Sequence, residues 1–189
     1  MTAIRDARPS DRGAILAVTL AAYEQYAAAL PPPLWAMYRQ SIQATLADVR
    51  PAAQIAAEEG GALVGTVLLY PAGAVMANPG GTPVTLEWPE VRLLAVPPAA
   101  RGKGVARRLM EECIQRAHAA GAPALTLHTA DIMSVAMRLY ERMGFARAVE
   151  LDFSPAPGIV AKGYKLPLTL PSPQRGEGGS EPSPQGEDG

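Results

Sequence analysis

The sequence of 189 residues predicts one α/β domain built on a mixed sheet. From its middle onward, apolar strand-like runs alternate with amphipathic helical runs, an order that places crossover helices on a sheet. The early part holds two adjoining β-capable runs around a glycine turn, which is typical of an antiparallel hairpin. A second full domain would be cramped at this length, so we expect a single catalytic-sized unit.

The first part of the chain predicts a strand, two helices and a hairpin. Ser, Thr, Asp and Asn are preferred at helix N-caps, and proline ends a helix, so these residues mark the helix limits. The expected elements are a strand at 2–5, a helix from Ser10 or Asp11 to the prolines at 31–33, a helix at 34–49, and a hairpin at 53–70 that turns at Glu59, Gly60 and Gly61.

Proline and glycine punctuate residues 71–83 so often that we expect a long loop or an extension of the hairpin there. Regular elements follow this segment without a break. They are a strand at about 86–96, a helix at about 104–120, a strand at 124–129, a helix at about 134–143, and two strands at about 146–153 and 159–166. This order indicates crossover helices followed by an antiparallel end of the sheet.

The end of the chain has a different composition. Beyond Leu170 it is rich in Pro, Gly, Ser, Gln and Glu, and "PSPQRGEG" recurs loosely as "PSPQGEDG". Such short polar units cannot bury a core. We therefore expect the domain to span residues 1–168 and residues 169–189 to form a disordered tail.

Composition excludes several classes of protein. The net charge is −1, with 48% hydrophobic and 19% charged residues, which does not fit a general nucleic-acid binder. Cys113 is the sole cysteine, so we expect no disulfide within the chain and no cysteine-based zinc site. No apolar run fits a signal peptide or approaches the roughly 20 residues of a membrane span. We expect a cytoplasmic protein without a membrane partner.

Two glycines stand where the helix at about 104–120 begins. Gly102 and Gly104 keep side chains away from the first-turn N–H groups, which together with the helix dipole favour anions. Positive charge surrounds them at Arg101, Lys103, Arg107 and Arg108. The pattern favours a phosphate site. The alternative is that the glycines serve only the backbone turn.

Two other phosphate motifs fit this stretch poorly. A Walker A loop would need a glycine where Pro97 stands, and a dinucleotide-binding turn would need one where Arg107 stands. An enzyme that binds nucleotide phosphates through another α/β fold is therefore the weaker alternative.

Two motifs resemble those of the GNAT superfamily of acyl-CoA-dependent N-acyltransferases. The pyrophosphate signature of that family is matched by Arg101, Gly104 and Ala106 after the strand "VRLLAV". A second segment, "AMRLYERMGF", places Tyr140, Glu141, Gly144 and Phe145 at the family's spacings. A looser resemblance extends over residues 1–167. It implies a GNAT fold: a mixed, mostly antiparallel sheet of about six or seven strands, splayed between the fourth and fifth, with about four helices.

The resemblance implies acetyl-CoA as cosubstrate and no metal. Its pyrophosphate would lie on the 102–106 turn, and its pantetheine arm would run between the strands at 91–96 and 124–129. Met133 stands where many members carry an asparagine, and Asp131 and Ser134 could partly replace that contact. The implied cofactor-binding residues are Leu94, Ala95, Val96, Arg101, Gly102, Lys103, Gly104, Val105, Ala106 and Ser134.

The resemblance also implies an acid and a base for acyl transfer. Tyr140 takes the position of the acid that protonates the thiolate; the alternative is a ring that only packs against the pantetheine arm or the core. For the base, Glu90 is the first candidate and His128 the second, although a carboxylate at a strand start is often solvated and a strand histidine is often structural. In the absence of a bulge, alternation places Glu90, Arg92 and Leu94 on one strand face and Val91, Leu93 and Ala95 on the other. Cys113 lies in the apolar stripe of its helix, which disfavours an acyl-enzyme.

Aromatic side chains of the first two helices are candidates for the acceptor site. They are Tyr23, Tyr26, Trp35 and Tyr38, with Trp88 beside the central strand. Core packing is the alternative explanation for them. The sequence thus predicts an N-acetyltransferase that acts on a primary amine of a small molecule or peptide by direct attack in a ternary complex. A non-catalytic acyl-CoA-binding sensor is the alternative, and a homodimer is a further expectation because dimers are common in the family.

Overall fold

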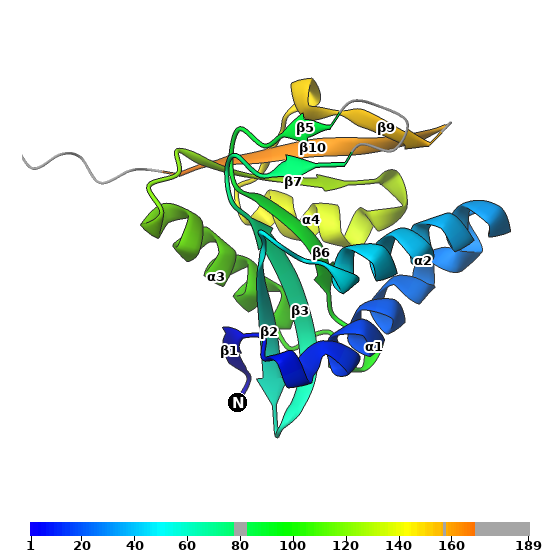
Figure 1. Cartoon of the computed structure of the whole chain (residues 1–189), viewed down its shortest axis with the longest axis vertical. Helices are drawn as coiled ribbons and strands as arrows, with labels where there is room; N and C mark the ends of the chain where they lie inside the picture. The colour runs from blue at the N-terminus through cyan, green and yellow to red at the C-terminus, as the bar shows by residue number, and fades with distance from the viewer. Residues whose placement is uncertain (78–82, 157, 169–189) are drawn as a thin grey trace, which may run out of the picture.

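A mixed sheet with helices on both faces organises the chain (Figure 1). The computed structural model describes residues 1–77, 83–156 and 158–168. The predicted tail at 169–189 lies outside the described residues. The α-helices are α1 (Arg12–Tyr23), α2 (Pro32–Ala47), α3 (Val105–Ala119) and α4 (Ser134–Arg142). The strands are β1 (Ala3–Asp6), β2 (Ala53–Glu59), β3 (Ala62–Tyr70), β4 (Val75–Met76), β5 (Val84–Thr85), β6 (Glu90–Ala95), β7 (Ala124–Thr129), β8 (Ala146–Arg147), β9 (Phe153–Ala156) and β10 (Ile159–Pro167).

The strand order is β1-β2-β3-β6-β7-β10-β8, with β9 also paired to β10 and with β4 and β5 in a separate hairpin. Each neighbouring pair is antiparallel except β6 and β7, which run parallel. The main core lies between the sheet and α3 with α4, and a second cluster joins α1 and α2 to the opposite face of β6. The predicted mixed, mostly antiparallel fold with four helices is confirmed.

The parallel strands β6 and β7 separate soon after they begin. Their register contains two pairs, Glu90 with Thr126 and Val91 with Leu127. Beyond Val91, β6 continues along β3 while its other edge leaves β7. The sheet is therefore splayed between its fourth and fifth strands, as the sequence predicts.

A β-bulge changes which face the side chains of β6 occupy. The partners of Thr66 and Leu68 on β3 are Ala95 and Arg92, so three steps on β6 match two on β3. Leu93 absorbs the extra residue with φ at 49°. The predicted alternation is wrong beyond this point, because Leu94 packs into the core beneath α3 while Leu93 contacts the cluster of α1 and α2.

Two predicted strands are shorter than expected. β6 begins at Glu90 rather than near residue 86, since Pro89 has no N–H to donate and its carbonyl accepts from Thr126. The expected strand at 146–153 divides into β8, a 3-10 turn at Val149–Leu151 and β9. Within the predicted loop, β4 and β5 pair as two short antiparallel strands, and residues 78–82 lie outside the described part of the chain.

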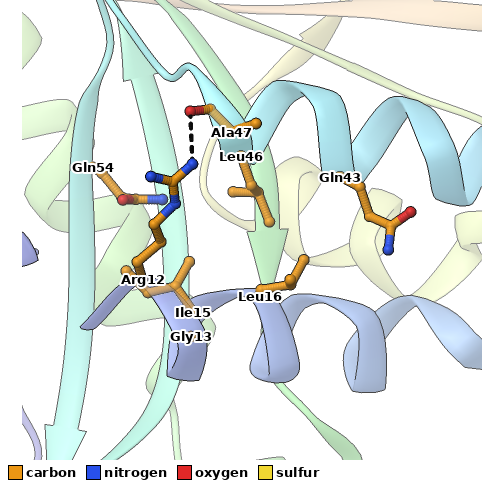
Figure 2. A pocket seen from close by; sticks show the side chains of 8 residues that line it. All are labelled: Arg12, Gly13, Ile15, Leu16, Gln43, Leu46, Ala47 and Gln54. Atoms are coloured by element: carbon orange, nitrogen blue, oxygen red, sulfur yellow. Dashed lines mark hydrogen bonds between the residues drawn. The ribbon is translucent and has the colours of Figure 1, made fainter. Parts of the chain in front are cut away.

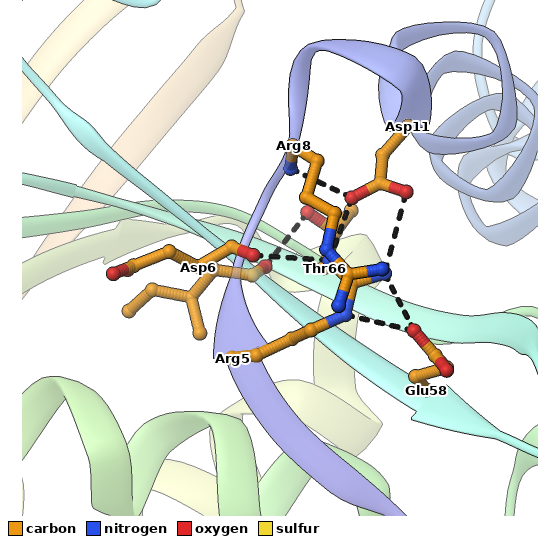
Figure 3. A network of polar contacts seen from close by, with 7 residues as sticks. Arg5, Asp6, Arg8, Asp11, Glu58 and Thr66 are labelled. Atoms are coloured by element: carbon orange, nitrogen blue, oxygen red, sulfur yellow. Dashed lines mark hydrogen bonds and ion pairs between the residues drawn. The ribbon is translucent and has the colours of Figure 1, made fainter.

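The first predicted helix also divides, into α1 and a 3-10 segment at Glu24–Ala29. Asp11 does not cap α1 with its side chain. Its carboxylate accepts from the backbone N–H of Arg8 at 2.7 Å and from Arg5 at 2.6 Å, while Arg5 also donates to Glu58 at 2.7 Å (Figure 3). These hydrogen bonds lower the pKa of Asp11 to about 2. They attach the start of α1 to the sheet through β1 and β2.

The close approach of the Val149–Leu151 turn to β10 depends on Gly163. A Cβ at this position would lie 2.4 Å from the Cβ of Leu151 and 2.8 Å from the carbonyl oxygen of Ala148. We expect Gly163→Ala to destabilise the protein by about 1–3 kcal/mol through overpacking. Chemical denaturation measures this, with Gly13→Ala as control, since a Cβ at Gly13 meets nothing within 4 Å. Equal stability of Gly163→Ala and wild type would contradict the packing assignment.

Candidate active site

An open helix terminus follows β6. Gly104 is the N-cap of α3 with φ at 74°, no side chain caps the helix there, and Gly102 also has positive φ at 77°. A Cβ at either glycine would meet nothing within 4 Å. The turn before α3 is therefore exposed and uncapped, with room beside both glycines, as an anion-binding helix terminus needs.

The cationic side chains around this turn have partners within the protein. Arg101 donates to the carbonyl oxygen of Val96 at 3.1 Å, to Gln25 Oε1 at 3.0 Å and to the carbonyl oxygen of Ala22 at 3.3 Å. Lys103 Nζ lies 3.3 Å from Glu59 Oε2 on β2. Arg101 thus connects the turn to the end of α1, a role that its place in the motif does not reveal.

The other predicted cofactor-binding residues differ in exposure: some have buried side chains, and others are open to solvent. Val105 is buried in the core, so its backbone rather than its side chain is available. Ala95 is buried between β6 and α1, and Leu94 and Val96 pack against the core beneath α3. Ser134 is exposed at the start of α4, and Asp131 forms an ion pair with Lys162. Gly104 and its neighbours therefore offer the most open part of the predicted site.

Tyr140 lies at the splay together with tyrosines of the first two helices. Its residue is 7% exposed, and its hydroxyl has no hydrogen-bond partner among the residues that the structure describes. Burial raises the pKa of Tyr140 above its ordinary value, and Tyr26 and Cys113 raise it further. The Tyr140 hydroxyl in turn contributes to the raised pKa of Tyr23 and to that of Tyr38. Tyr140 is therefore protonated at neutral pH and can donate that proton.

Four of the five aromatic acceptor candidates come together. Tyr23, Tyr26 and Trp35, with Tyr38, form one cluster on α1, the 3-10 segment after it and α2. Trp88 lies elsewhere: the Lys165 ammonium of β10 sits 3.5 Å from the centroid of its ring, near the closed end of the β6–β7 pair. Met133, just before α4, packs against the tyrosine cluster.

The two candidate bases form one buried network. Glu90 is 2% exposed rather than solvated, with Oε1 2.5 Å from Arg92 Nε and Oε2 3.3 Å from His128 Nδ1. Burial opposes ionisation of Glu90, but the contacts with His128 and Arg92 outweigh burial and lower its pKa. A lowered pKa makes Glu90 a weak base, so the network serves better to hold β6 and β7 together where they begin to part.

Both nitrogens of His128 face groups of the protein. Nε2 lies 2.8 Å from the carbonyl oxygen of Leu151, and a carbonyl only accepts, so Nε2 carries a proton. Nδ1 lies 3.3 Å from Oε2 of Glu90 but has no hydrogen-bond partner in the described part of the chain. The ring edge of Phe153 also covers His128 at 5.0 Å between centroids. His128 offers no free nitrogen to an acceptor in this arrangement.

We expect Glu90→Gln to destabilise the protein by about 3 kcal/mol at pH 7, because it removes the charge that Arg92 and His128 face. Since the folded-state pKa of Glu90 is lowered, its contribution is present above the unfolded value of about 4.3 and is lost as the pH falls below it. The difference in unfolding free energy between the variant and the wild type should therefore become smaller in acid. Chemical denaturation at several pH values measures this difference. Glu111→Gln, which removes an exposed i,i+4 pair, is the control with almost no effect. A gap that is constant from pH 7 to pH 3 would contradict the ionised network.

Cys113 is fully buried, and desolvation raises the pKa of its thiol to about 12. A thiol in that state is not an effective nucleophile. Within the described ranges, no group of three or more His, Cys, Asp or Glu side chains is arranged to hold a metal ion. Among the same residues, no helix has the length and hydrophobicity that crossing a bilayer requires.

Two surface hollows lie apart from the predicted site residues. One, of about 280 Å³, lies between α1 and α2, where Arg12 donates to the carbonyl oxygen of Ala47 at 3.2 Å above Leu16 and Leu46 (Figure 2). The other, of about 540 Å³, lies between α3 and α4. Tyr23 and Leu93 belong to the cluster that α1 and α2 form against β6.

A family model described as "Acetyltransferase (GNAT) family" matches residues 19–145, which include both motifs and all four α-helices in whole or in part. The chain belongs to the GNAT acetyltransferase family. The resemblance that the two motifs indicate is thereby confirmed. The matched range includes both the turn before α3 and Tyr140.

One curated relative and two solved structures are similar to parts or all of this chain. A curated relative from Azospirillum brasilense, named "IAA acetyltransferase", is 42% identical over 57 residues, or 30% of this chain and 37% of that protein. The matched stretch thus spans little more than a third of that relative. A GNAT acetyltransferase from Brucella melitensis, solved in complex with acetyl-CoA, has a TM-score of 0.60 at 24% identity, covering 92% of each chain. PaiA N-acetyltransferase from Thermoplasma acidophilum, solved with coenzyme A, has a TM-score of 0.67 at 16% identity, covering 89% of this GNAT chain and 99% of the other. These two structures share the fold.

Proposed function

We propose that the protein transfers an acetyl group from acetyl-CoA to a primary amine by direct attack in a ternary complex. The observation that carries this proposal is the juxtaposition of an open helix terminus at Gly104 with a splayed sheet and a buried, protonated Tyr140. Membership of the GNAT family, and the acetyl-CoA complex of the Brucella melitensis neighbour, support the choice of donor.

The donor fits the turn between β6 and α3. Unpaired N–H groups at the start of α3 suit a pyrophosphate, and the glycines leave room for its oxygens. The edge of β6 that leaves β7 presents backbone groups that an extended pantetheine arm could pair with. One such N–H would polarise the thioester carbonyl, an effect worth about 2.7–4 kcal/mol in other acyl-transfer enzymes.

Tyr140 supplies the proton that the departing sulfur needs. As the amine nitrogen forms its bond to the acetyl carbon, the carbon–sulfur bond breaks and the electron pair stays on sulfur. Transfer of the Tyr140 proton to that sulfur releases CoA as the thiol. The nitrogen loses its excess proton to water as the amide forms, and Tyr140 takes a proton back from water before the next turnover. Because its pKa is raised, Tyr140 stays protonated over the whole neutral range.

The amine enters best in its neutral form. Glu90 and His128 are both committed to the network at the closed end of the β6–β7 pair. Attack therefore depends on the fraction of amine that has already lost its proton. The rate at low amine concentration should rise with pH up to the pKa of the amine, which is about 7.7–8.0 for an α-amino group and about 10.4 for a lysine side chain.

One observation favours a second candidate function, a non-catalytic acyl-CoA sensor. No carboxylate or imidazole with a free lone pair acts on Tyr140 among the residues that the structure describes. A sensor would bind acetyl-CoA at the α3 turn without turnover. A sensor needs no proton donor, so a protonated tyrosine at the position of the acid in the second motif favours the enzyme.

Initial rates of thiol release test the proposal, with acetyl-CoA and a primary amine both varied. A ternary complex predicts double-reciprocal lines that intersect. Parallel lines would contradict direct attack and indicate an acyl-enzyme. Binding of acetyl-CoA without thiol release on any primary amine would favour the sensor.

A further inference from the structure

We propose that the acceptor is a small primary amine with an aromatic or apolar body and no second cationic group, and that a carboxylate on it is favoured. This names the acceptor of the proposed acetyl transfer and so rests on that function. The proposal is argued from two features. They are the tyrosine cluster (Tyr23, Tyr26, Trp35 and Tyr38) and the guanidinium of Arg101 beside it.

The tyrosine cluster is an aromatic wall with defined ring geometry. Tyr23 meets Tyr26 at 5.9 Å and 71°, and it meets Tyr38 at 5.8 Å and 69°. Trp35 meets Tyr38 at 6.2 Å and 70°. Tyr23 is buried, whereas Tyr26, Trp35 and Tyr38 are partly exposed, so these three residues offer ring surface to a further aromatic ring.

The remaining side chains around this wall are apolar. Leu93 and Ala95 come from the part of β6 that has left β7, Met133 precedes α4, and Leu20 comes from α1. An acceptor that reaches Tyr140 along this cluster therefore loses contacts with water and gains contacts with apolar side chains. Such an exchange favours a hydrocarbon or aromatic body.

No carboxylate acts on the inner hydroxyls of the wall to receive a second ammonium group, and Glu24, which follows Tyr23, is exposed to solvent. The groups that act on the Tyr38 and Tyr140 hydroxyls are other tyrosines and Cys113, and the charged group that acts on Tyr26 is Arg101. No carboxylate acts on any of these three hydroxyls within the described part of the chain. A polyamine or aminoglycoside would have to desolvate its further cationic groups here without a counter-charge, which is costly.

The positive charge of Arg101 is not cancelled by its partners. Its three hydrogen bonds end on the carbonyl oxygens of Val96 and Ala22 and on the side-chain amide of Gln25, all of which are neutral. Gln25 immediately precedes Tyr26 in the sequence. A carboxylate on the acceptor would therefore lie in a favourable field if it approached along this side of the wall.

A comparison of three amines tests the apolar part of the proposal. Phenylethylamine has an aromatic body, phenylalanine adds a carboxylate, and spermidine adds cationic groups instead. At saturating acetyl-CoA, kcat/KM for phenylethylamine and phenylalanine should exceed that for spermidine by at least about tenfold. A higher kcat/KM for spermidine would overturn the proposal.

Two variants at one position test the charge. Gln25→Glu is nearly isosteric and cancels the charge of Arg101, whereas Gln25→Ala removes the hydrogen bond and leaves the charge. The ratio of kcat/KM for phenylalanine to that for phenylethylamine should fall about fivefold in Gln25→Glu and stay near the wild-type value in Gln25→Ala. Since both acceptors share one donor, the ratio is independent of changes in acetyl-CoA binding. An unchanged ratio in Gln25→Glu would contradict the role of Arg101.

Failure of this inference can be told from failure of the proposed function. Calorimetric titration of the wild-type protein with acetyl-CoA reports on the donor site alone. If acetyl-CoA binds and spermidine is acetylated while the aromatic amines are not, the acceptor class is wrong and the acetyltransferase stands. If acetyl-CoA does not bind, the proposed function itself fails.

Discussion

Gly104→Glu is expected to weaken acetyl-CoA binding by at least about 100-fold. Gly104 has φ at 74°, a conformation that a side chain adopts only with strain, and it directly precedes the first-turn N–H groups of α3. Glutamate would add a negative charge where a pyrophosphate is expected to lie, so repulsion adds to the strain. Calorimetric titration with acetyl-CoA measures the change in affinity.

The other end of the same helix offers a matched control. Gly121 also has positive φ, at 71°, and a Cβ there meets nothing within 4 Å. Gly121→Glu therefore carries a similar backbone strain and the same charge but lies far along α3 from the turn. It should bind acetyl-CoA like the wild type, and similar thermal melts of the two variants would show that strain is matched. Wild-type affinity in Gly104→Glu would contradict the phosphate site.

Tyr140→Phe should lower kcat by between about 10² and 10⁴, the range typical of a general acid, while the affinity for acetyl-CoA stays the same. The reason is that phenylalanine keeps the ring packing against Phe145, at 6.0 Å between centroids, and removes only the hydroxyl. Stability should hold or rise slightly, since the deleted hydroxyl has no described hydrogen-bond partner. Initial rates with saturating amine measure kcat.

Tyr164→Phe provides the comparison for this variant. Tyr164 is also buried, at 5% exposure, but its hydroxyl donates to Glu141 at 3.3 Å on the outer side of α4. Loss of that hydroxyl should leave kcat within about twofold of the wild type, because a hydrogen bond of that length away from the site affects stability more than rate. A Tyr140→Phe enzyme as active as Tyr164→Phe would exclude Tyr140 as the acid.

The parts of the fold that sequence alone predicts are those set by local patterns. The apolar stripe of α3, with its start at two glycines, is a local property, and α3 begins and ends within a residue of its expected limits. The β2–β3 hairpin follows in the same way from Gly60 and Gly61, both of which have positive φ. These elements needed no knowledge of distant partners.

The errors arise where residues far apart in the chain decide the backbone. The bulge at Leu93 depends on the register of β6 against β3, which alternation along one strand cannot reveal. The turn at Val149–Leu151 interrupts an expected strand because Asp152 pairs with Arg147 and accepts from the backbone N–H of Gly163. The alternation of apolar and polar residues along a strand carries no information about either of these long-range contacts.

In the candidate site, too, local motifs are readable from the sequence and long-range contacts are not. Gly104 and Tyr140 are named by their motifs. The burial of Glu90 is not predictable, because its partner His128 lies 38 positions away on the next strand. Gln25 escaped prediction altogether, since its contact with Arg101 spans 76 positions. The sequence carried no signal for that contact beyond the nearby tyrosines.

The most direct test of the account is a calorimetric titration of the wild-type protein with acetyl-CoA. The open terminus of α3 beside the splayed strands predicts saturable binding at one site per chain. Absence of binding would contradict the phosphate site at Gly104, on which both the proposed acetyl transfer and the inferred acceptor depend.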